Sequence, residues 1–199
     1  MGLRVHPSAK ALIFDLDGTL LDSMPLHFLA WKEICRKKLD YDFTEEFFYA
    51  HAGSSSDKIF EDIKKVTGKE FITQDLAVEK EHLYETTMIH KLTVVQPVVD
   101  IVIAYHDVLP KAIGTGSPSE GSWMAIRAMG LDKYFDILVS KEDVLHPKPA
   151  PDTFLRCAEL MGVDPAVCQV FEDGDPGLQA ARTAGMIATD IRPFINGGA

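Results

Sequence analysis

Two carboxylates stand two residues apart at the end of an apolar run. Asp15 and Asp17 follow residues 11–14, a run typical of a buried strand. In extended backbone, side chains two apart point the same way, so both carboxylates can reach one site, while Gly18 permits a sharp turn beside a ligand. One carboxylate can attack phosphorus and form an aspartyl-phosphate, and the other acid can protonate the leaving alkoxide. The alternative is a strand that ends in a solvated acidic turn.

Another apolar run ends at Thr115. The segment after it, Ser117-Pro118-Ser119-Glu120, has the form of a capping box with proline at the first helical position, so a helix is expected to begin there. A helix amino terminus attracts anions, and the Thr115 hydroxyl and the backbone N–H groups around Gly116 can donate to phosphoryl oxygens. An ordinary strand-to-helix turn is the alternative.

A third run, residues 137–139, precedes Lys148, which lies between Pro147 and Pro149. The prolines restrict the backbone and can hold the ammonium in place. A carboxylate that attacks a phosphate dianion meets like-charge repulsion of about 4 kcal/mol per unit pair at about 4 Å and an effective dielectric of 20. A fixed lysine offsets that repulsion. Most lysines are solvated surface charges, and only the proline frame and the position after a strand favour a functional role.

A fourth run, residues 167–171, ends in Glu172 and Asp173. Carboxylate oxygens close to a phosphate site imply Mg²⁺. Asp175 precedes Pro176 and an alanine-rich stretch, so we expect it to be a helix N-cap. Asp173 is therefore the favoured ligand, and Glu172 is either a second ligand or acts through water.

In order and spacing, these four segments resemble the four motifs of the haloacid dehalogenase-like phosphatase superfamily, and the resemblance spans nearly the whole chain. It implies that Asp15 is the nucleophile and that Asp17 is the general acid and base. Thr115 and Lys148 would hold the transferring phosphoryl group. The remaining implied roles are Mg²⁺ binding by Asp15, Asp17 (through its main-chain carbonyl), Asp173 and Glu172, and substrate binding by Gly18, Thr19, His27, Ser55, Gly116 and Ser117.

A long charged, helix-like stretch interrupts the alternating pattern after the first strand. We therefore predict an α/β fold, with a Rossmann-like doubly wound parallel sheet core at residues 1–21 and 92–199 and an inserted helical cap domain at residues 22–91. The insert resembles the small cap of the β-phosphoglucomutase-like branch, which would close over small phosphorylated metabolites and exclude water. His27 matches a family histidine near the hinge, although a lone histidine on a helix is more often structural.

Within that branch, the chain most resembles bacterial fructose-1-phosphatases that also accept 6-phosphogluconate, through the strings AIGTGS, KPAPDTFLRCAELMGV and VFEDGDPGLQAARTAGM. The alternative is a β-phosphoglucomutase, which needs a second phosphate site in its cap. The loop at residues 53–57 carries Ser56 where the mutase has an arginine, and the loss of a guanidinium favours a phosphatase. Ser55 can still bind substrate hydroxyls and Lys80 can partly replace the lost charge, but a solvated position is the favoured interpretation of both.

Composition agrees with a cytoplasmic enzyme of small metabolites. The 199 residues, 46% of them hydrophobic, suffice for one substantial core and a small appendage. A net charge of −10 argues against nucleic acid and anionic membranes as partners, and no obligate protein partner is implied. The three cysteines lack metal-ligand spacing and are expected to be buried thiols in a reducing compartment. We expect neither a signal peptide nor a membrane span.

Two hypotheses from other classes are weaker. A phospho-accepting receiver domain also combines carboxylates, Mg²⁺, a hydroxyl residue and a lysine, but it lacks the second acid two residues after the acceptor and has no helical insert after the first strand. A non-catalytic sugar-phosphate sensor would keep the pocket without turnover, and intact Asp15 and Asp17 oppose that interpretation.

Overall fold

The computed structural model describes residues 2–51, 54 and 56–195, and the backbone divides into two compact units. Unit 1 comprises Met1–Asp22 and Thr93–Ala199, and unit 2 comprises Ser23–Leu92. Within the described ranges, no helix is long and apolar enough to cross a membrane. That unit 2 serves as a cap over unit 1 remains a prediction from the sequence.

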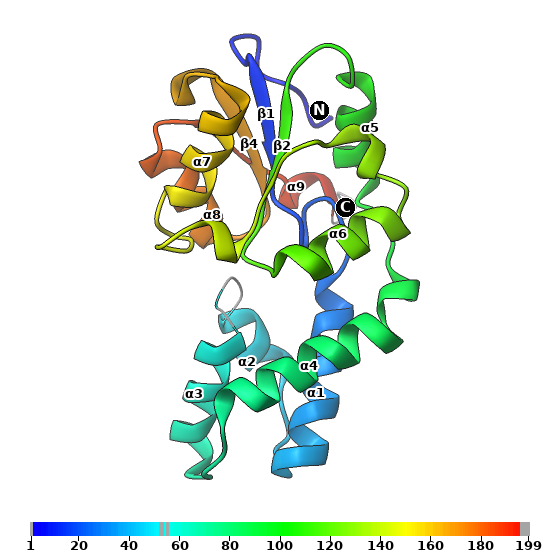
Figure 1. Cartoon of the computed structure of the whole chain (residues 1–199), viewed down its shortest axis with the longest axis vertical. Helices are drawn as coiled ribbons and strands as arrows, with labels where there is room; N and C mark the ends of the chain where they lie inside the picture. Colours follow the sequence, from blue (N-terminus) through cyan, green and yellow to red (C-terminus); the bar gives the residue numbers. More distant parts are fainter. Residues whose placement is uncertain (1, 52–53, 55, 196–199) are drawn as a thin grey trace. The chain divides into compact units, whose positions relative to one another are not determined.

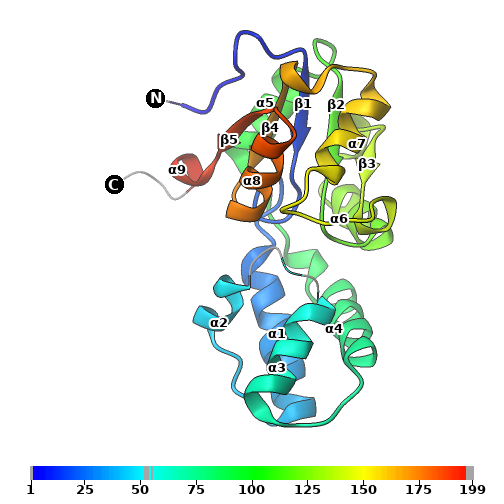
Figure 2. The same cartoon turned by 90° about the vertical axis from the view of Figure 1, so that its left-hand side faces the viewer.

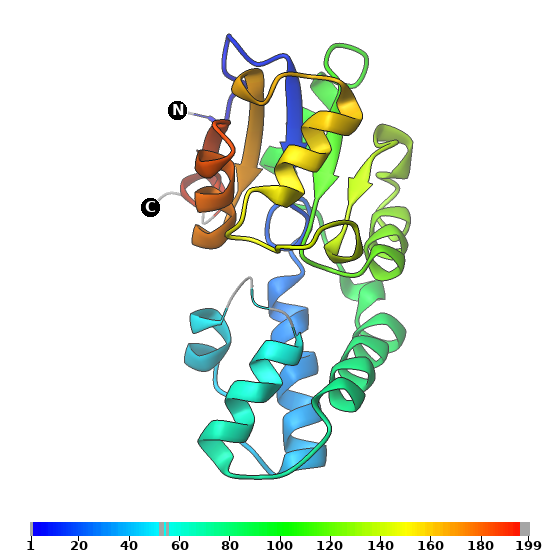
Figure 3. The same ribbon diagram turned by 60° about the vertical axis from the view of Figure 1, so that its left-hand side comes forward.

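Unit 1 is built on a five-stranded parallel sheet in the order β3-β2-β1-β4-β5. The strands are β1 (Ala11–Phe14), β2 (Lys111–Gly114), β3 (Leu138–Val139), β4 (Cys168–Glu172) and β5 (Ile187–Asp190). Figure 3 shows four of them, β4, β1, β2 and β3, side by side and pointing the same way. The chain builds outward from β1 to one edge and then to the other, so the predicted doubly wound α/β core is confirmed.

Helices cover both faces of this sheet. In Figure 1, α7 and α8 lie on one side of it and α5 and α6 on the other. The helices of unit 1 are α5 (Gln96–Ala104), α6 (Ser119–Ala128), α7 (Asp152–Met161), α8 (Asp175–Thr183) and α9 (Arg192–Ile195), with 3-10 turns η2 (Asp132–Tyr134), η3 (Lys141–Asp143) and η4 (Pro165–Val167). Because both faces are covered, the inner strands are buried along their whole length, which is why they are largely apolar in the sequence. The buried Gln169 of β4 is an exception, and its amide donates to Thr189 of β5 at 2.9 Å.

The core of unit 1 lies between the central strands and the helices that cover them. Ile13 and Val170 meet Phe154 and Cys157 of α7 in one fully buried cluster. The Phe14 ring stacks on the ring of its strand neighbour Phe171 with centroids 5.0 Å apart. Burial of aromatic and aliphatic side chains on this scale stabilises the strands by about 1.5–3 kcal/mol for each large side chain. The strand ends are thereby fixed in position.

Unit 2 is entirely helical. Its elements are α1 (Met24–Leu39), α2 (Glu45–Ala50), α3 (Ser56–Thr67), α4 (Thr73–Thr87) and the 3-10 turn η1 (Ile89–Lys91). Helix α4 packs against α1 and α3, as Figure 2 shows. Trp31 is the centre of the core, with the rings of Phe43 and Phe60 at centroid distances of 5.3 and 4.6 Å. Helix α1 begins with proline in its first turn, a position that does not need a backbone N–H donor.

Candidate active site

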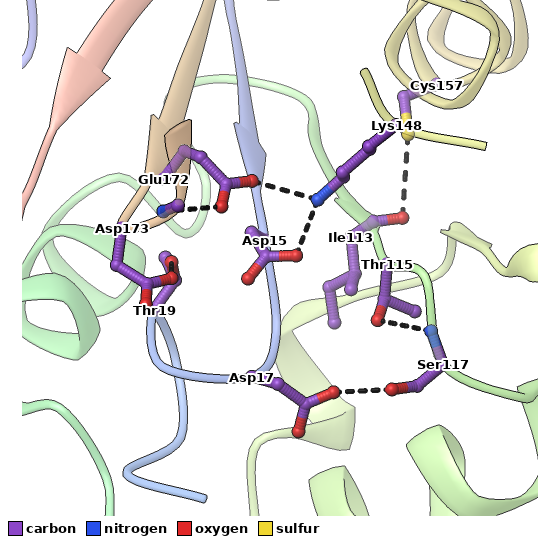
Figure 4. A network of polar contacts seen from close by, with 11 residues as sticks. Asp15, Asp17, Thr19, Ile113, Thr115, Ser117, Lys148, Cys157, Glu172 and Asp173 are labelled. Carbon is purple, nitrogen blue, oxygen red and sulfur yellow. Dashed lines mark hydrogen bonds and ion pairs between the residues drawn. The ribbon is translucent and has the colours of Figure 1, made fainter. Parts of the chain in front are cut away.

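The carboxyl ends of three neighbouring strands bring the predicted site residues of unit 1 together. Asp15 follows β1, Thr115 follows β2, and Glu172 is the last residue of β4. Parallel strands end at the same edge of a sheet, which is where ligands bind in open α/β folds. Figure 4 shows these side chains around Lys148, which reaches them from the loop before α7.

The Lys148 ammonium is the centre of the site. Its Nζ donates to Asp15 Oδ1 at 2.6 Å and to Glu172 Oε2 at 2.8 Å, and the side chain is only 8% exposed. The Phe154 ring lies beneath it, with its centroid 4.6 Å from Nζ. Burial by itself would lower the pKa of Lys148, but the two carboxylates outweigh burial and raise the pKa above its ordinary value. Lys148 is therefore held charged against the proposed nucleophile.

Asp15 and Asp173 lie in a strongly negative environment. Burial and the charge of Glu172 raise the pKa of Asp15 to about 7, in spite of Lys148. Burial and the charge of Asp15 raise the pKa of Asp173 to about 7, although Thr19 donates to Asp173 Oδ1 at 2.8 Å. Each carboxylate thus opposes ionisation of the next, and the protein groups alone leave negative charge uncompensated.

This excess of negative charge fits a divalent cation. Asp15, Glu172 and Asp173 each offer a carboxylate oxygen, and these atoms lie within 4.8 Å of one another. A Cβ on Gly18 would lie 2.3 Å from Asp173 Oδ2, so only glycine lets the first loop approach that carboxylate so closely. Oxygen ligands in such a cluster are those that Mg²⁺ prefers. The donor set therefore fits a magnesium ion.

Glu172 has partners for both of its carboxylate oxygens within the protein. Oε1 accepts from the backbone N–H of Gly174 at 3.0 Å, and Oε2 accepts from Lys148. A Cβ on Gly177 would lie 2.0 Å from Oε2, so α8 begins directly against this side chain. Burial raises the pKa of Glu172 more than Lys148 lowers it. These contacts favour a role in orienting Lys148 and the β4–α8 turn over direct metal ligation.

The predicted capping box at Ser117 is wrong. Helix α6 begins at Ser119, its N-cap is Pro118, and no side chain caps it. The Ser117 hydroxyl instead donates to Asp17 Oδ2 at 2.5 Å, and the Ser117 N–H donates to Thr115 Oγ1 at 3.0 Å (Figure 4). Because the Ser117 hydroxyl bonds to Asp17 in the neighbouring loop, it does not cap helix α6.

The predicted N-cap at Asp175 is also wrong by one position. Gly174 is the N-cap of α8, and Asp175 is the first helical residue. Its exposed carboxylate pairs with Arg192 at 2.9 Å, because α9 brings that guanidinium to the start of α8. Asp175 therefore remains outside the cluster of carboxylates that could hold a metal.

The structure does not place all the predicted substrate contacts. Gly18, Thr19, Gly116 and Ser117 lie in the two loops that follow β1 and β2. His27 belongs to unit 2, where its ring stacks on Tyr84 with centroids 4.0 Å apart. Ser55 and its neighbour Gly53 lie outside the described residues.

The expectation that Lys80 is solvated is wrong. Lys80 is 3% exposed, and its Nζ lies 3.2 Å from Glu81 Oε1 and 3.1 Å from His27 Nδ1. Ser56, the first residue of α3, donates to the same Glu81 oxygen at 2.8 Å. One signal was present in the sequence, because Lys80 shares the helical spacing of Leu76 and Tyr84, both buried.

Comparisons with known proteins give consistent results. A family model described as haloacid dehalogenase-like hydrolase matches residues 9–185. The fructose-1-phosphate phosphatase YqaB of Escherichia coli is 42% identical over 91% of this chain and 95% of its own length. The β-phosphoglucomutase of Bacillus subtilis is 31% identical over 92% of this chain and 83% of its own length. A crystal structure of a HAD hydrolase from Entamoeba histolytica superposes with a TM-score of 0.80, at 28% identity, and covers 92% of this chain and 84% of that one.

Proposed function

Because the chain belongs to the haloacid dehalogenase-like hydrolases, we propose that it is a Mg²⁺-dependent phosphatase of small sugar phosphates that works through an aspartyl-phosphate on Asp15. One observation carries the proposal. A buried lysine joins Asp15 to Glu172 at 2.6 and 2.8 Å, with Asp173 in the same cluster of carboxylates. This arrangement suits an anionic nucleophile that must meet an anionic substrate.

In the first step, a carboxylate oxygen of Asp15 forms a bond to phosphorus while the bond from phosphorus to the sugar oxygen breaks. Lys148 orients the Asp15 carboxylate and offsets its repulsion from the phosphate. Asp17 gives its proton to the departing sugar oxygen. In the second step, water attacks phosphorus, Asp17 takes a proton from that water, and inorganic phosphate leaves Asp15 as a carboxylate.

Thr115 and the loop after it bind the phosphoryl oxygens in this proposal. Thr115 Oγ1 already accepts a hydrogen bond from the Ser117 N–H, so its own hydrogen can donate to a phosphoryl oxygen. The backbone N–H of Gly116 is a further donor ahead of α6, because the N–H groups of Ser117 and Ser119 already donate within the protein. These contacts would fix the phosphoryl group opposite Asp15.

Asp15, Asp173 and the main-chain carbonyl of Asp17 are the groups that would hold Mg²⁺. When bound, the ion would neutralise charge on the phosphoryl group. Glu172 contributes by positioning Lys148 and by accepting from Gly174, as its two contacts suggest.

Fructose-1-phosphate and 6-phosphogluconate are the proposed substrate types. The 42% identity to a fructose-1-phosphate phosphatase supports the first, and the second follows from the family resemblance of the sequence. Unit 2 is proposed to act as the cap, with His27 and Ser55 among its substrate contacts. The enzyme is further proposed to be cytoplasmic and to need no obligate protein partner. The second candidate is a β-phosphoglucomutase, which the 31% identity to such an enzyme favours. Ser56 in the place of an arginine opposes it.

Parallel assays separate the two candidates. Phosphate release is measured from fructose-1-phosphate, 6-phosphogluconate and other sugar phosphates, with Mg²⁺ and with a chelator, beside an assay for isomerisation of β-glucose-1-phosphate. Fast release without isomerisation supports the phosphatase. Isomerisation with little release supports the mutase, and equal release with the chelator overturns Mg²⁺ dependence.

A further inference from the structure

We propose that Ser117 is a positioning residue that holds the carboxyl group of Asp17 in the orientation needed for proton transfer. The proposal rests on the proposed function, because it concerns the residue that would protonate the leaving sugar oxygen. It gives Ser117 a different role from the substrate contact that the family resemblance implies. The evidence is a single contact between two loops and the way each partner is held.

The contact joins residues 100 positions apart in the chain. Ser117 Oγ donates to Asp17 Oδ2 at 2.5 Å, which is the distance of a strong hydrogen bond from a hydroxyl to a carboxylate. Figure 4 shows the two side chains pointing toward each other from the loops after β2 and β1. The bond therefore ties the acid to a different strand end from the one that carries it.

Ser117 is itself firmly held. Its backbone N–H donates to Thr115 Oγ1 at 3.0 Å, and its carbonyl accepts from Lys141 at 3.3 Å. Thr115 in turn donates its backbone N–H to Val139 of β3 at 2.9 Å. The hydroxyl thus projects from a loop that is anchored to the sheet, which makes it a fixed reference point for a neighbouring side chain.

Asp17 is more exposed than Asp15, and the bond from Ser117 bears directly on the orientation of its side chain. Asp15 is 6% exposed and is bonded to a buried lysine, whereas Asp17 is only partly buried. A helix-capping role for Ser117 would explain its hydroxyl equally well, but α6 has Pro118 as its N-cap with no side-chain bond. The N–H of Ser119 donates to Glu142 at 3.1 Å instead. The Ser117 hydroxyl is thus directed to the acid.

The test uses two substrates that differ in their need for an acid. A sugar phosphate releases a basic alkoxide that requires a proton, whereas 4-nitrophenyl phosphate releases a stable phenolate that does not. Ser117→Ala is expected to lower kcat/KM for the sugar phosphate about 10- to 100-fold, part of the 10²–10⁴ that general acid catalysis supplies. The loss for 4-nitrophenyl phosphate is expected to stay within about threefold of wild type on the same reasoning.

Three further variants complete the design. Ser117→Thr keeps the hydroxyl and should restore most of the lost kcat/KM. Ser119→Ala is the matched control, two residues away, and should change neither substrate. In an Asp17→Asn background, Ser117→Ala should add no further loss for the sugar phosphate, because the group that it positions has been removed. Melting temperatures of all variants report on folding.

The results distinguish a positioning role of Ser117 from a direct contact with the substrate. Equal losses for the two substrates, or a further loss in the Asp17→Asn background, would overturn the positioning role and indicate a direct contact with substrate. No loss for either substrate would overturn it as well. A wild-type protein that releases no phosphate from either compound would reject the proposed function, and the role of Ser117 with it.

Discussion

Among the described residues, each unit has a lysine buried beside aromatic rings, Lys148 in unit 1 and Lys80 in unit 2, yet these two lysines have opposite electrostatic surroundings. The Lys148 side chain is 8% exposed, with Phe154 beneath its ammonium, and that of Lys80 is 4% exposed, with Trp31 and Tyr84 at 5.4 and 5.7 Å. Lys148 contacts two carboxylates, and Asp173 adds a third negative charge to the same cluster. Lys80 contacts one carboxylate, Glu81, and a histidine.

The pKa shifts of Glu172 and Glu81, the glutamates that contact these lysines, reflect the same difference. Burial raises the pKa of Glu172, and Lys148 does not compensate for it. Burial would also raise the pKa of Glu81, but Lys80, His27 and the hydrogen bond from Ser56 bring it below its ordinary value. Unit 2 therefore balances its buried charge internally, whereas unit 1 leaves an excess of negative charge. Burial of a lysine therefore does not by itself distinguish the proposed active site, whereas the excess of negative charge around Lys148 does.

The largest effect is expected from Asp15, the proposed nucleophile. Asp15→Asn should lower kcat by more than about 10³-fold, because the aspartyl-phosphate cannot form. Phosphate release at saturating substrate measures the change. Asp107→Asn, which alters a 93% exposed carboxylate of the same unit, is the control and should keep wild-type turnover. Normal turnover by Asp15→Asn would reject the mechanism.

Removal of each lysine tests the charge comparison directly. Lys148→Met should cost about 3–5 kcal/mol of unfolding free energy, because it leaves the buried carboxylates of Asp15 and Glu172 without their counter-ion. Lys80→Met should cost less, because Glu81 is 26% exposed and keeps its hydrogen bond from Ser56. In Lys148→Met, Mg²⁺ should recover much of this loss, since Asp15, one of the two carboxylates that Lys148 contacts, is a proposed ligand. In Lys80→Met, Mg²⁺ should add no more than it adds to wild type. Urea unfolding with Mg²⁺ and with a chelator measures the unfolding free energy of both variants. Equal recovery by Mg²⁺ in the two variants would contradict the inference that only unit 1 has an excess of negative charge.

The stability of unit 1 should depend on pH and on Mg²⁺ together. Asp15 and Asp173 have pKa values of about 7 in the folded protein against an ordinary 3.8, so the folded state keeps protons that the unfolded state releases. With a chelator, the unfolding free energy should therefore fall as pH rises from about 4 to about 7 and level off above that range. At 100-fold excess over its Kd, Mg²⁺ should restore about 2.7 kcal/mol at pH 8, or roughly 5–10 °C in Tm.

The same addition should have a smaller effect at pH 5, because protons then compete with the cation for these carboxylates. Thermal unfolding at pH 5 to 8 measures the shift. Asp173→Asn should remove part of the pH slope, and Asp107→Asn should not. An equal Mg²⁺ shift at both ends of the range would contradict the assignment of these carboxylates to the cation site.

The smallest effect is expected from substitution of Glu81 and Glu172. The resulting changes in unfolding free energy should differ in sign or size. Glu81→Gln should lower the unfolding free energy by about 1–2 kcal/mol at pH 7, because the folded state favours the charged form of Glu81. Glu172→Gln should cost less, or stabilise the protein when a chelator is present, because it relieves repulsion from Asp15. Urea midpoints compare the two variants. A larger loss in Glu172→Gln would show that the balance of charge has been assigned to the wrong unit.

The α/β architecture was predictable because its strands are buried on both faces. Residues 11–14 are an apolar run followed by Asp15, residues 168–171 are apolar except for Gln169 and are followed by Glu172, and the sheet places the two strands as neighbours. The expected grouping of Asp15, Thr115 and Asp173 followed from the ends of three strands, whereas Lys148 lies in a loop well beyond β3 and was assigned from its two flanking prolines and from the resemblance to the family motifs. Local sequence carries this information, since each strand needs only its own residues to be recognised.

Contacts between distant segments were not predictable in the same way. The bond from Ser117 to Asp17 depends on the packing of two loops, and the local pattern around Ser117 pointed to a helix cap instead. Lys80 looks like a surface charge by residue type, and only its spacing from Leu76 and Tyr84 indicates the buried face. In each case a partner far along the chain overrides the local preference of the residue.

The pairing of β1 also affects the order in which the protein folds during synthesis. Ile13 lies opposite Ala112 on one side and Val170 on the other, so the central strand pairs only with much later parts of the chain. Unit 2 is one continuous segment, Ser23–Leu92, and its helices can form from nearby contacts. Asp22 and Thr93, which flank unit 2, are joined by a hydrogen bond of 2.9 Å. Once unit 2 has folded, the chain that must still be closed between β1 and β2 is therefore much shorter than the sequence separation of the two strands. Asp15 is therefore synthesised early, but its strand gains both neighbours only after β4 has emerged from the ribosome.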